Sequence, residues 1–381
     1  MNGVMMLVNY FPPLPTGGAE RQAERLAEYM ASQNVHSGVI TRKVGSLPKR
    51  DCRNGIDIYR ISQFGPGKVK TLSFTILSII KLLRLRDSYD IFHAHLAFSP
   101  AIAGVIAGKL LRKRVIVKFG NSDTFGDIQR SKKTWRGRLR LFILRHWADM
   151  CIALDPAMHN EILAAGFADE RVLLMDNGID SKKFTQCFDK NSAKQALGFN
   201  GKTVLLYTGR FTPQKALPNL LQALRDVVIE RPDICLILLG HGEEVQMLTN
   251  LVSKLELQQH VMFIEPVSDV KPYLDAADIF VLPSLAEGIS NSLLEAMSCG
   301  LACIATNVGG SPEVLEKGEC GLLVPTGQIA ELRNAIIYLA TNADVRKSLG
   351  VKARQRILAR YDFQVVGRQY HSLYKRLLEA S

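Results

Sequence analysis

Short apolar runs of strand length alternate with helical patterns along the chain, and this alternation restricts the fold more than any other feature. In the first half we expect strands at 4–8, 36–41, 56–61, 90–95, 115–119, 150–154 and 172–176, and helices at 18–33 and 99–113. The pattern then restarts, with strands at 203–209, 234–240, 261–265, 279–283, 302–306 and 321–325, and helices at 216–231 and 244–257. Such alternation predicts parallel sheets with right-handed crossovers, and continuous apolar strands predict helices on both faces. We therefore expect an α/β protein with two doubly wound domains.

A polar stretch with turn signals, residues 177–193, predicts the domain boundary. We place the first domain at 1–186 and the second at 187–362, since 381 residues suffice for two domains. The tail, residues 363–381, has apolar side chains on one helical stripe.

The positive charge of the chain is confined to its first half. Residues 1–186 contain 28 Lys and Arg against 16 Asp and Glu, which accounts for the whole net charge of +12. A one-sided basic domain implies an anionic partner: nucleic acid, a membrane surface or a phosphorylated substrate. Two basic stretches with apolar residues, 68–86 and 130–147, suggest an anionic membrane surface, and core helices with a solvated basic face are the alternative. No nucleic-acid-binding signature accompanies the charge, so we expect no nucleic-acid partner.

The remaining composition indicates a cytoplasmic protein, either free or peripheral on the inner face of the membrane. No apolar run reaches the roughly 20 residues of a membrane-spanning helix. The start of the chain, MNGVMMLVNYF, resembles a buried strand more than a signal peptide. The seven cysteines are scattered and form no Cys-x-x-Cys pair, so we expect reduced thiols and no metal site.

The stretch EGISNSLLEA places Glu287 in a loop after an expected strand and Glu295 about one turn into a helix. Ligands of open α/β sheets bind outside the carboxyl ends of the strands, so Glu287 would stand at the binding crevice. Residues 288–292 would offer backbone N–H groups to an anion, and Glu295 would reach a hydroxyl such as that of a ribose. The alternative is a capped surface helix with a solvated glutamate.

Three further motifs follow expected strands. In TGRFTPQK, Arg210 and Lys215 would both reach one phosphate group, unless they are two surface cations. In LLGHGEE, Gly240 permits close approach of a ligand. In PTGGAE, Gly17 and Gly18 would expose N–H groups between the first strand and its helix.

In this order, the glycine pair, G-R-x(4)-K, G-x-G and E-x(7)-E resemble the motifs of glycosyltransferase family 4, and the resemblance covers nearly the whole chain. It implies the GT-B fold, in which two Rossmann-like domains face each other across a cleft and the C-terminal helix packs back on the first domain. It also implies retaining transfer of a sugar from a nucleotide donor, usually a UDP-sugar.

Carried over by motif, Arg210 and Lys215 hold the diphosphate, Glu295 binds the ribose, Glu287 contacts the donor sugar and Gly18 approaches the diphosphate. The implied nucleotide-sugar-binding residues are Gly17, Gly18, Arg210, Lys215, Gly240, Phe263, Ile264, Gly288, Ile289, Ser290, Asn291 and Glu295. The expected catalytic residues are His95, Arg210, Lys215 and Glu287.

One departure from the family concerns a histidine that many members carry near a strand end in the first domain. Phe119 stands at that position, and His93 and His95 are the nearby candidates. His95 would contact the sugar or the acceptor, with a core or surface histidine as the alternative. Lys118 and Asp123 are further candidates for acceptor handling.

We therefore expect a retaining glycosyltransferase that moves a hexose or an N-acetylhexosamine from a UDP-sugar to a lipid-linked or glycan acceptor. Fixed cations would offset the charge of the leaving diphosphate, and the sequence has no Asp-x-Asp pair, so we expect neither a metal nor another cofactor. A UDP-sugar epimerase of the same fold and a basic nucleic-acid-binding protein are the rival functions.

Overall fold

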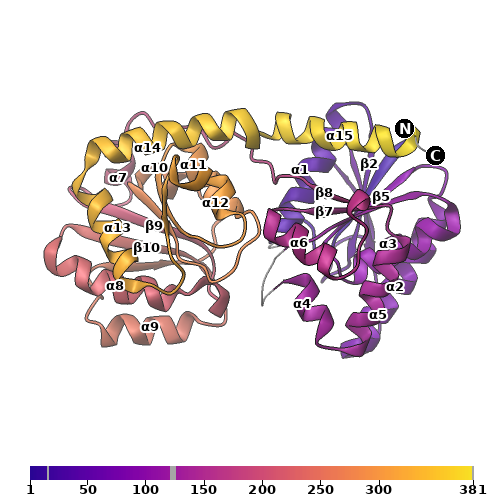
Figure 1. Ribbon diagram of the computed structural model, residues 1–381, viewed down its shortest axis with the longest axis horizontal. Helices are drawn as coiled ribbons and strands as arrows, with labels where there is room; N and C mark the ends of the chain where they lie inside the picture. The colour runs from indigo at the N-terminus through magenta and orange to yellow at the C-terminus, as the bar shows by residue number, and fades with distance from the viewer. Residues whose placement is uncertain (15–16, 121–125, 380–381) are drawn as a thin grey trace. The chain divides into compact units, whose positions relative to one another are not determined.

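The computed structural model describes residues 1–14, 17–120 and 126–379, and it contains two compact units. Unit 1 comprises Met1–Gly178 and the C-terminal Phe363–Ser381, and unit 2 comprises Ile179–Asp362. Each unit is an α/β layer structure with helices on both faces of a twisted sheet (Figure 1). The expected fold class, two doubly wound α/β domains, is confirmed.

Unit 1 is built on an eight-stranded sheet with the order β3-β4-β2-β1-β5-β6-β7-β8. Its strands are β1 (Gly3–Leu7), β2 (His36–Arg42), β3 (Arg50–Arg53), β4 (Ile56–Ile61), β5 (Ile91–His95), β6 (Arg114–Lys118), β7 (Met150–Ala153) and β8 (Val172–Leu174). Its helices are α1 (Gly18–Ser32), α2 (Gly67–Arg84), α3 (Ser99–Leu111), α4 (Asp127–Lys132), α5 (Trp135–Trp147), α6 (Pro156–Ala164) and α15 (Phe363–Glu379). The central strand β1 is buried at every position, as its continuous apolar sequence GVMML predicts.

Strand β3 is the one element of this sheet that the apolar pattern did not predict. It pairs antiparallel with β4 at the edge of the sheet, and its sequence, RDCR, is polar and exposed. Asn54 and Gly55 connect the two strands with φ values of 52° and 76°, as a two-residue hairpin turn requires. The Asn-Gly dipeptide was therefore the local signal for this hairpin.

Unit 2 contains a six-stranded parallel sheet with the order β11-β10-β9-β12-β13-β14. Its strands are β9 (Thr203–Arg210), β10 (Ile234–His241), β11 (Val261–Ile264), β12 (Ile279–Leu282), β13 (Ala302–Thr306) and β14 (Leu322–Val324). Its α-helices are α7 (Lys190–Ala196), α8 (Leu217–Glu230), α9 (Val245–Lys254), α10 (Lys271–Ala276), α11 (Asn291–Ser298), α12 (Ser311–Val314), α13 (Ile329–Thr341) and α14 (Ala343–Arg356). Strand order changes direction between β9 and β12, which is the switch point where open α/β sheets bind ligands.

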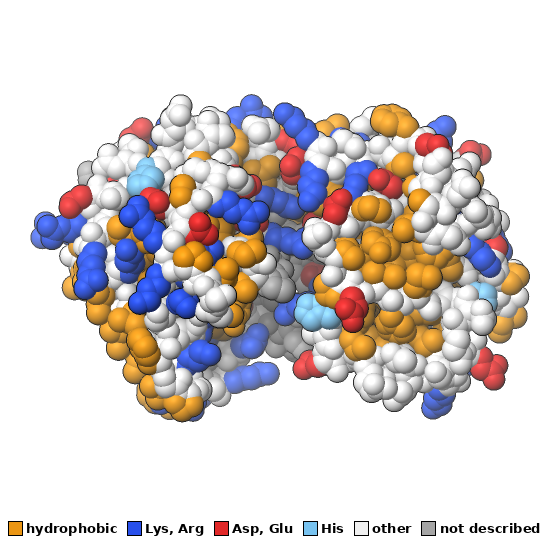
Figure 2. Space-filling model, turned by 180° about the vertical axis from the view of Figure 1, so that it is seen from behind, with side chains coloured by type: hydrophobic (Ala, Val, Ile, Leu, Met, Phe, Trp, Pro, Cys, Tyr) orange, Lys and Arg blue, Asp and Glu red, His pale blue; other side chains and the backbone are white. Residues whose placement is uncertain are grey.

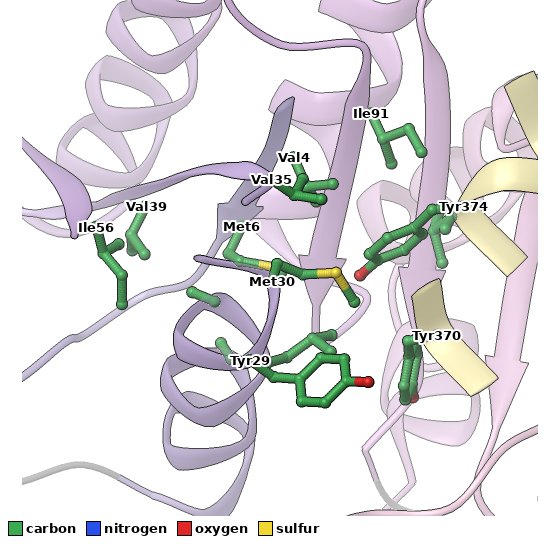
Figure 3. Packing of buried hydrophobic residues seen from close by; sticks show 14 of the residues in the cluster. Val4, Met6, Tyr29, Met30, Val35, Val39, Ile56, Ile91, Tyr370 and Tyr374 are labelled. Carbon is green, nitrogen blue, oxygen red and sulfur yellow. The ribbon is translucent and has the colours of Figure 1, made fainter. Parts of the chain in front are cut away.

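The C-terminal helix α15 completes the core of unit 1. Its apolar stripe joins a buried cluster that contains Val4 and Met6 of β1 and Met30 of α1, and Tyr370 and Tyr374 reach this cluster from α15 (Figure 3). The helix lies beside α1, so a C-terminal helix packs on the N-terminal unit (Figure 1). Loss of α15 would expose this core to water.

The division between the units lies at Gly178, eight residues before the boundary that we expected after residue 186. The reason is that the intervening segment packs in unit 2. Phe184 is buried, and its carbonyl oxygen accepts hydrogen bonds from Ser298 Oγ at 2.7 Å and Arg354 Nη1 at 2.6 Å. Residues 179–186 therefore belong to the second unit, although their polar sequence with turn signals is typical of a linker.

Candidate active site

The parallel strands of unit 2 bring the expected site residues to one edge of its sheet. Arg210 ends β9 and is paired with His241 at the end of β10, and Gly240 is paired with Gly209. Ile264 ends β11 beside Leu239. Because the carboxyl ends of parallel strands lie at the same edge, three of the four motifs meet here.

A buried ion pair joins two of these motifs. Lys215, in a single 3₁₀ turn after β9, donates a hydrogen bond from Nζ to Oε1 of Glu287, and Ser284 Oγ donates to the same oxygen at 2.6 Å. Gln214 donates from Nε2 to the carbonyl oxygen of Ala286 at 2.7 Å, and Leu285 N–H donates to the carbonyl oxygen of Gln214 at 2.8 Å. The loop after β12 is thus held against the turn after β9.

The loop also rests on a glycine pair after β13. Gly310 N–H donates to the carbonyl oxygen of Gly288 at 3.1 Å, and a Cβ on Gly309 would lie 1.8 Å from the carbonyl oxygen of Glu287. Gly309 also has a φ of 51°, which favours glycine. Sequence reasoning missed this support, although two consecutive glycines shortly after an expected strand were a signal for close backbone approach.

Glu295 lies in α11, which follows this loop. Ser290 caps the helix by accepting a hydrogen bond from Leu293 N–H at 3.4 Å. Gly288, Ile289, Ser290 and Glu295 are buried, whereas Asn291 is half-buried. A fully solvated Glu295 is therefore excluded, and the assignment of Glu295 to a ribose stays a prediction.

The glycines of the G-x-G motif have a structural reason for being glycines. A Cβ on Gly240 would lie 1.8 Å from the carbonyl oxygen of Gly209, and one on Gly242 would lie 2.1 Å from that of Phe211. We expected these glycines to permit the close approach of a ligand. In the structure, the backbone at Gly209 and Phe211 makes that close approach. Phe263, one of the implied nucleotide-sugar-binding residues, is half-buried, with its ring centroid 6.2 Å from that of Phe211.

Arg210 is an exposed cation at this edge of the sheet. Its side chain is open to solvent, and its carbonyl oxygen accepts a hydrogen bond from the buried Tyr207 hydroxyl at 2.9 Å, which fixes the backbone there. The guanidinium group is therefore available to an anion, whereas Lys215 is engaged with Glu287. Gly17 and Gly18 begin α1 in unit 1, where both are exposed, and their approach to a donor stays a prediction.

His95 lies in the interior of unit 1. The rings of His93 and His95 stack with centroids 4.4 Å apart, and Nδ1 of His93 forms a 2.7 Å hydrogen bond with the Tyr374 hydroxyl. Burial holds the pKa of both imidazoles well below the ordinary value, so both rings are neutral at pH 7. Neither ring nitrogen of His95 has a hydrogen-bond partner within the described ranges. This enclosure favours a core histidine over the sugar or acceptor contact that we expected.

Lys118 is also committed to the interior. Its Nζ donates to Asn177 Oδ1 at 2.8 Å and to the Tyr370 hydroxyl at 2.9 Å, and burial lowers its pKa to about 7. Phe119 is buried against Phe167, and Asp123 lies outside the described residues.

Within the described ranges, no group of three or more His, Cys, Asp or Glu side chains is arranged to hold a metal ion. Among the helices that the structure describes, none has both the length and the apolarity to cross a membrane.

Comparisons with known proteins agree with this architecture. A family model described as Glycosyltransferase Family 4 matches residues 16–183, and one described as Glycosyl transferases group 1 matches residues 189–356. N-acetyl-alpha-D-glucosaminyl L-malate synthase of Bacillus anthracis is 25% identical over 319 residues, which are 84% of this chain and 83% of that protein. UDP-Gal:alpha-D-GlcNAc-diphosphoundecaprenol alpha-1,3-galactosyltransferase of Escherichia coli is 27% identical over 294 residues, which are 74% of each chain. The crystal structure of Anabaena Alr3699/HepE in complex with UDP-glucose is similar in fold, with a TM-score of 0.82 at 21% identity, over 98% of this chain and 99% of that one.

Proposed function

This chain belongs to glycosyltransferase family 4, and from this premise we propose that it moves a hexose or an N-acetylhexosamine from a UDP-sugar to an acceptor with retention at the anomeric carbon. The observation that carries the proposal is the arrangement at the carboxyl edge of unit 2. There Arg210 is exposed, and Lys215 is fixed by the buried Glu287. An exposed guanidinium at the same sheet edge as a positioned ammonium group suits a diphosphate.

The proposed reaction needs stabilisation of a leaving diphosphate. As the bond between the anomeric carbon and the β-phosphate oxygen breaks, negative charge grows on that phosphate, and Arg210 and Lys215 would offset it. The acceptor hydroxyl would attack the same face of the sugar and transfer its proton to the departing phosphate as the new glycosidic bond forms. Because two side-chain cations are at hand, we propose that the transfer needs no metal ion.

The names of one relative and one solved structure support a UDP-linked donor, and the name of that relative also supports a lipid-linked acceptor. The Escherichia coli relative is named for UDP-Gal and for an acceptor on diphosphoundecaprenol, and the Anabaena structure holds UDP-glucose. We therefore propose a role in surface polysaccharide or glycolipid synthesis. A UDP-sugar epimerase is the rival, and it would convert the donor in the absence of any acceptor.

A thermal-shift panel of UDP, GDP, ADP and their sugars, measured with EDTA present, tests the donor site. We expect stabilisation by UDP and by one UDP-sugar, and we expect Glu295→Ala to lose it. If no nucleotide stabilises the protein, the assignment of Arg210, Lys215 and Glu295 to a nucleotide sugar is wrong.

A membrane surface is the partner that we propose for the basic side of unit 1. Helices α2 and α5 both pack against α3, and both present apolar side chains to solvent. Those of α2 are Val69, Leu72, Ile76 and Ile80, and those of α5 are Trp135, Leu139, Phe142 and Trp147. Lys and Arg side chains are numerous on this unit, in the left half of Figure 2. Exposed apolar and aromatic residues among cations suit the interface of an anionic bilayer.

Co-sedimentation with vesicles tests this partner. We expect binding to vesicles with anionic lipid and little binding to neutral vesicles, and we expect Trp135→Ser with Phe142→Ser to weaken it. Ile229→Ser is the matched control, because Ile229 is 77% exposed on α8 of unit 2. Equal binding to both vesicle types, or no binding, would contradict the proposal.

A further inference from the structure

Three arginines surround the first residues of α3, at the carboxyl edge of the sheet of unit 1, and the proposed donor chemistry uses none of them. Arg42, at the end of β2, donates from Nη2 to Ser99 Oγ at 3.1 Å. The guanidinium carbons of Arg130 and Arg140, from α4 and α5, lie 5.6 and 4.7 Å from the ring centroid of Phe98. Side chains from three separate elements thus converge on two consecutive residues.

Arg42 is held in place by neutral groups. Besides Ser99, it donates from Nε to Asn9 Oδ1 at 3.1 Å and from Nη1 to Gln63 Oε1 at 2.8 Å, and its guanidinium carbon lies 4.7 Å from the ring centroid of Phe74. Within the part of the chain that the structure describes, no carboxylate pairs with it, and partial burial lowers its pKa. Three of its five N–H groups are used, so two remain for a ligand.

The cluster has more positive than negative charge. The carboxylate of Asp127 interacts electrostatically with Arg130 and Arg140. Asp127 is buried, and its carboxylate accepts a hydrogen bond from Gly120 N–H at 2.9 Å. Arg140 donates from Nη2 to Ser131 Oγ at 2.5 Å, while its buried Nε has no acceptor within the described ranges. Among the residues that the structure describes, one carboxylate faces three guanidinium groups, which leaves a surplus of two positive charges, and Arg140 keeps one buried N–H group without an acceptor there.

We propose that the arginine cluster, Arg42, Arg130 and Arg140, binds a phosphate or diphosphate group of the acceptor. Planar guanidinium groups match phosphate oxygens in geometry, and a surplus of two positive charges matches a dianion. The carboxyl edge of an open α/β sheet is the place where such a ligand binds. This inference rests on the proposed transferase function and narrows its acceptor to a phosphorylated one. The phosphate belongs either to a soluble sugar phosphate or to a lipid.

Calorimetric titration of the full chain tests the cluster. Saturating UDP occupies the donor site, and glucose 1-phosphate and geranyl diphosphate are then titrated as the soluble and the lipid probe. We expect at least one probe to bind, and we expect Arg42→Gln and Arg140→Gln each to weaken it by ten-fold or more. UDP affinity, measured in the same samples, should stay unchanged. Arg138→Gln is the matched control, because Arg138 is exposed on the same helix as Arg140.

Two further measurements separate a lost site from a lost fold. Far-UV circular dichroism and the melting temperature report whether each variant is folded. Arg42→Lys keeps the positive charge but loses the planar guanidinium group, so this variant should retain part of the affinity. The inference is overturned if neither probe binds at millimolar concentration, or if Arg138→Gln weakens binding as much as Arg42→Gln. Failure of UDP to bind would contradict the donor function instead, and the probes are then titrated in Arg210→Ala to judge the cluster by itself.

Discussion

Lys215 and Glu287, 72 positions apart in sequence, form an ion pair in which only 13% and 6% of the side-chain surfaces are exposed. The motifs assigned Lys215 to a diphosphate and Glu287 to a sugar, and in the structure the two side chains bind each other. Their pairing ties the turn after β9 to the loop after β12. Each side chain therefore holds the other in position, and the loss of either one should displace both.

Lys215→Met would leave Glu287 as a buried carboxylate without its cation. Removing one partner of a buried pair costs about 3 kcal/mol, so we expect the free energy of unfolding to fall by that amount. Glu287→Gln should also destabilise the protein, and the double variant should be less destabilised than the sum of the single variants. All three should lose transferase activity. Urea denaturation measures the stabilities, and additive effects within 0.5 kcal/mol would contradict the coupling.

Gly309→Ala should displace the loop after β12, because Gly309 packs against the backbone of that loop. The new Cβ would lie 1.8 Å from the carbonyl oxygen of Glu287 and would also take a φ of 51°, so the loop must shift. We expect a loss of roughly 2 kcal/mol beyond the strain of positive φ, and weaker UDP-sugar binding. The matched control is Gly327→Ala, since Gly327 has a φ of 75° with nothing within 4 Å of the new Cβ. Equal melting temperatures of the two variants would refute the steric argument.

The sequence was most informative where a single physical pattern decided the structure. Continuous apolar runs located the strands of both sheets to within a few residues, because a strand that is buried on both faces needs apolar side chains throughout. Motifs at strand ends located the carboxyl edge of unit 2, because parallel strands bring their ends together. Strand β3 lacked that pattern, since it is a polar edge strand.

Long-range contacts were beyond the reach of such patterns. His95 stacks on His93, and His93 is hydrogen-bonded to Tyr374, which lies 281 positions further along the chain. No local sequence pattern reports that contact. The support of Glu287 by Gly309 is likewise a contact between two loops. The three arginines of the cluster come from three separate elements. The excess of Lys and Arg in the first half of the sequence was therefore their only sequence signal.

Glu295 should make the protein prefer a nucleotide whose ribose carries its 2′- and 3′-hydroxyl groups. If its carboxylate binds the ribose hydroxyls, the native protein prefers UDP to 2′,3′-dideoxy-UDP, and Glu295→Gln loses most of that preference. A hydrogen bond to a charged group contributes about 1.5–3 kcal/mol, which corresponds to a preference of roughly ten-fold or more. Competition between the two nucleotides, measured by calorimetry, checks this. Glu331→Gln removes an exposed carboxylate from α13 of the same unit and so tests for a general charge effect. An unchanged preference in Glu295→Gln would remove Glu295 from the ribose site.

Lys118 should make the stability of unit 1 depend on pH. Burial lowers its pKa to about 7, against an ordinary value of 10.5, so between these values the unfolded chain binds a proton that the folded unit does not. Stability should therefore rise with pH from 7 towards 10, by at most roughly 5 kcal/mol for the full shift. The neutral His93 and His95 act in the same direction at lower pH, because their pKa values lie below the ordinary 6.5 and acid favours the unfolded, protonated form.

The slope of stability against pH separates these two contributions. Between pH 7 and 9, Lys118→Met should flatten the slope, whereas Lys109→Met, on the exposed face of α3, should leave it unchanged. Between pH 6.5 and 5, His95→Phe should lose less stability than the native protein, because one buried imidazole no longer has to stay neutral in acid. Urea denaturation at each pH supplies the slopes. If Lys118→Met follows the native slope between pH 7 and 9, the Lys118 ammonium group is charged in the folded protein, and the polar contacts with Asn177 and Tyr370 solvate it fully.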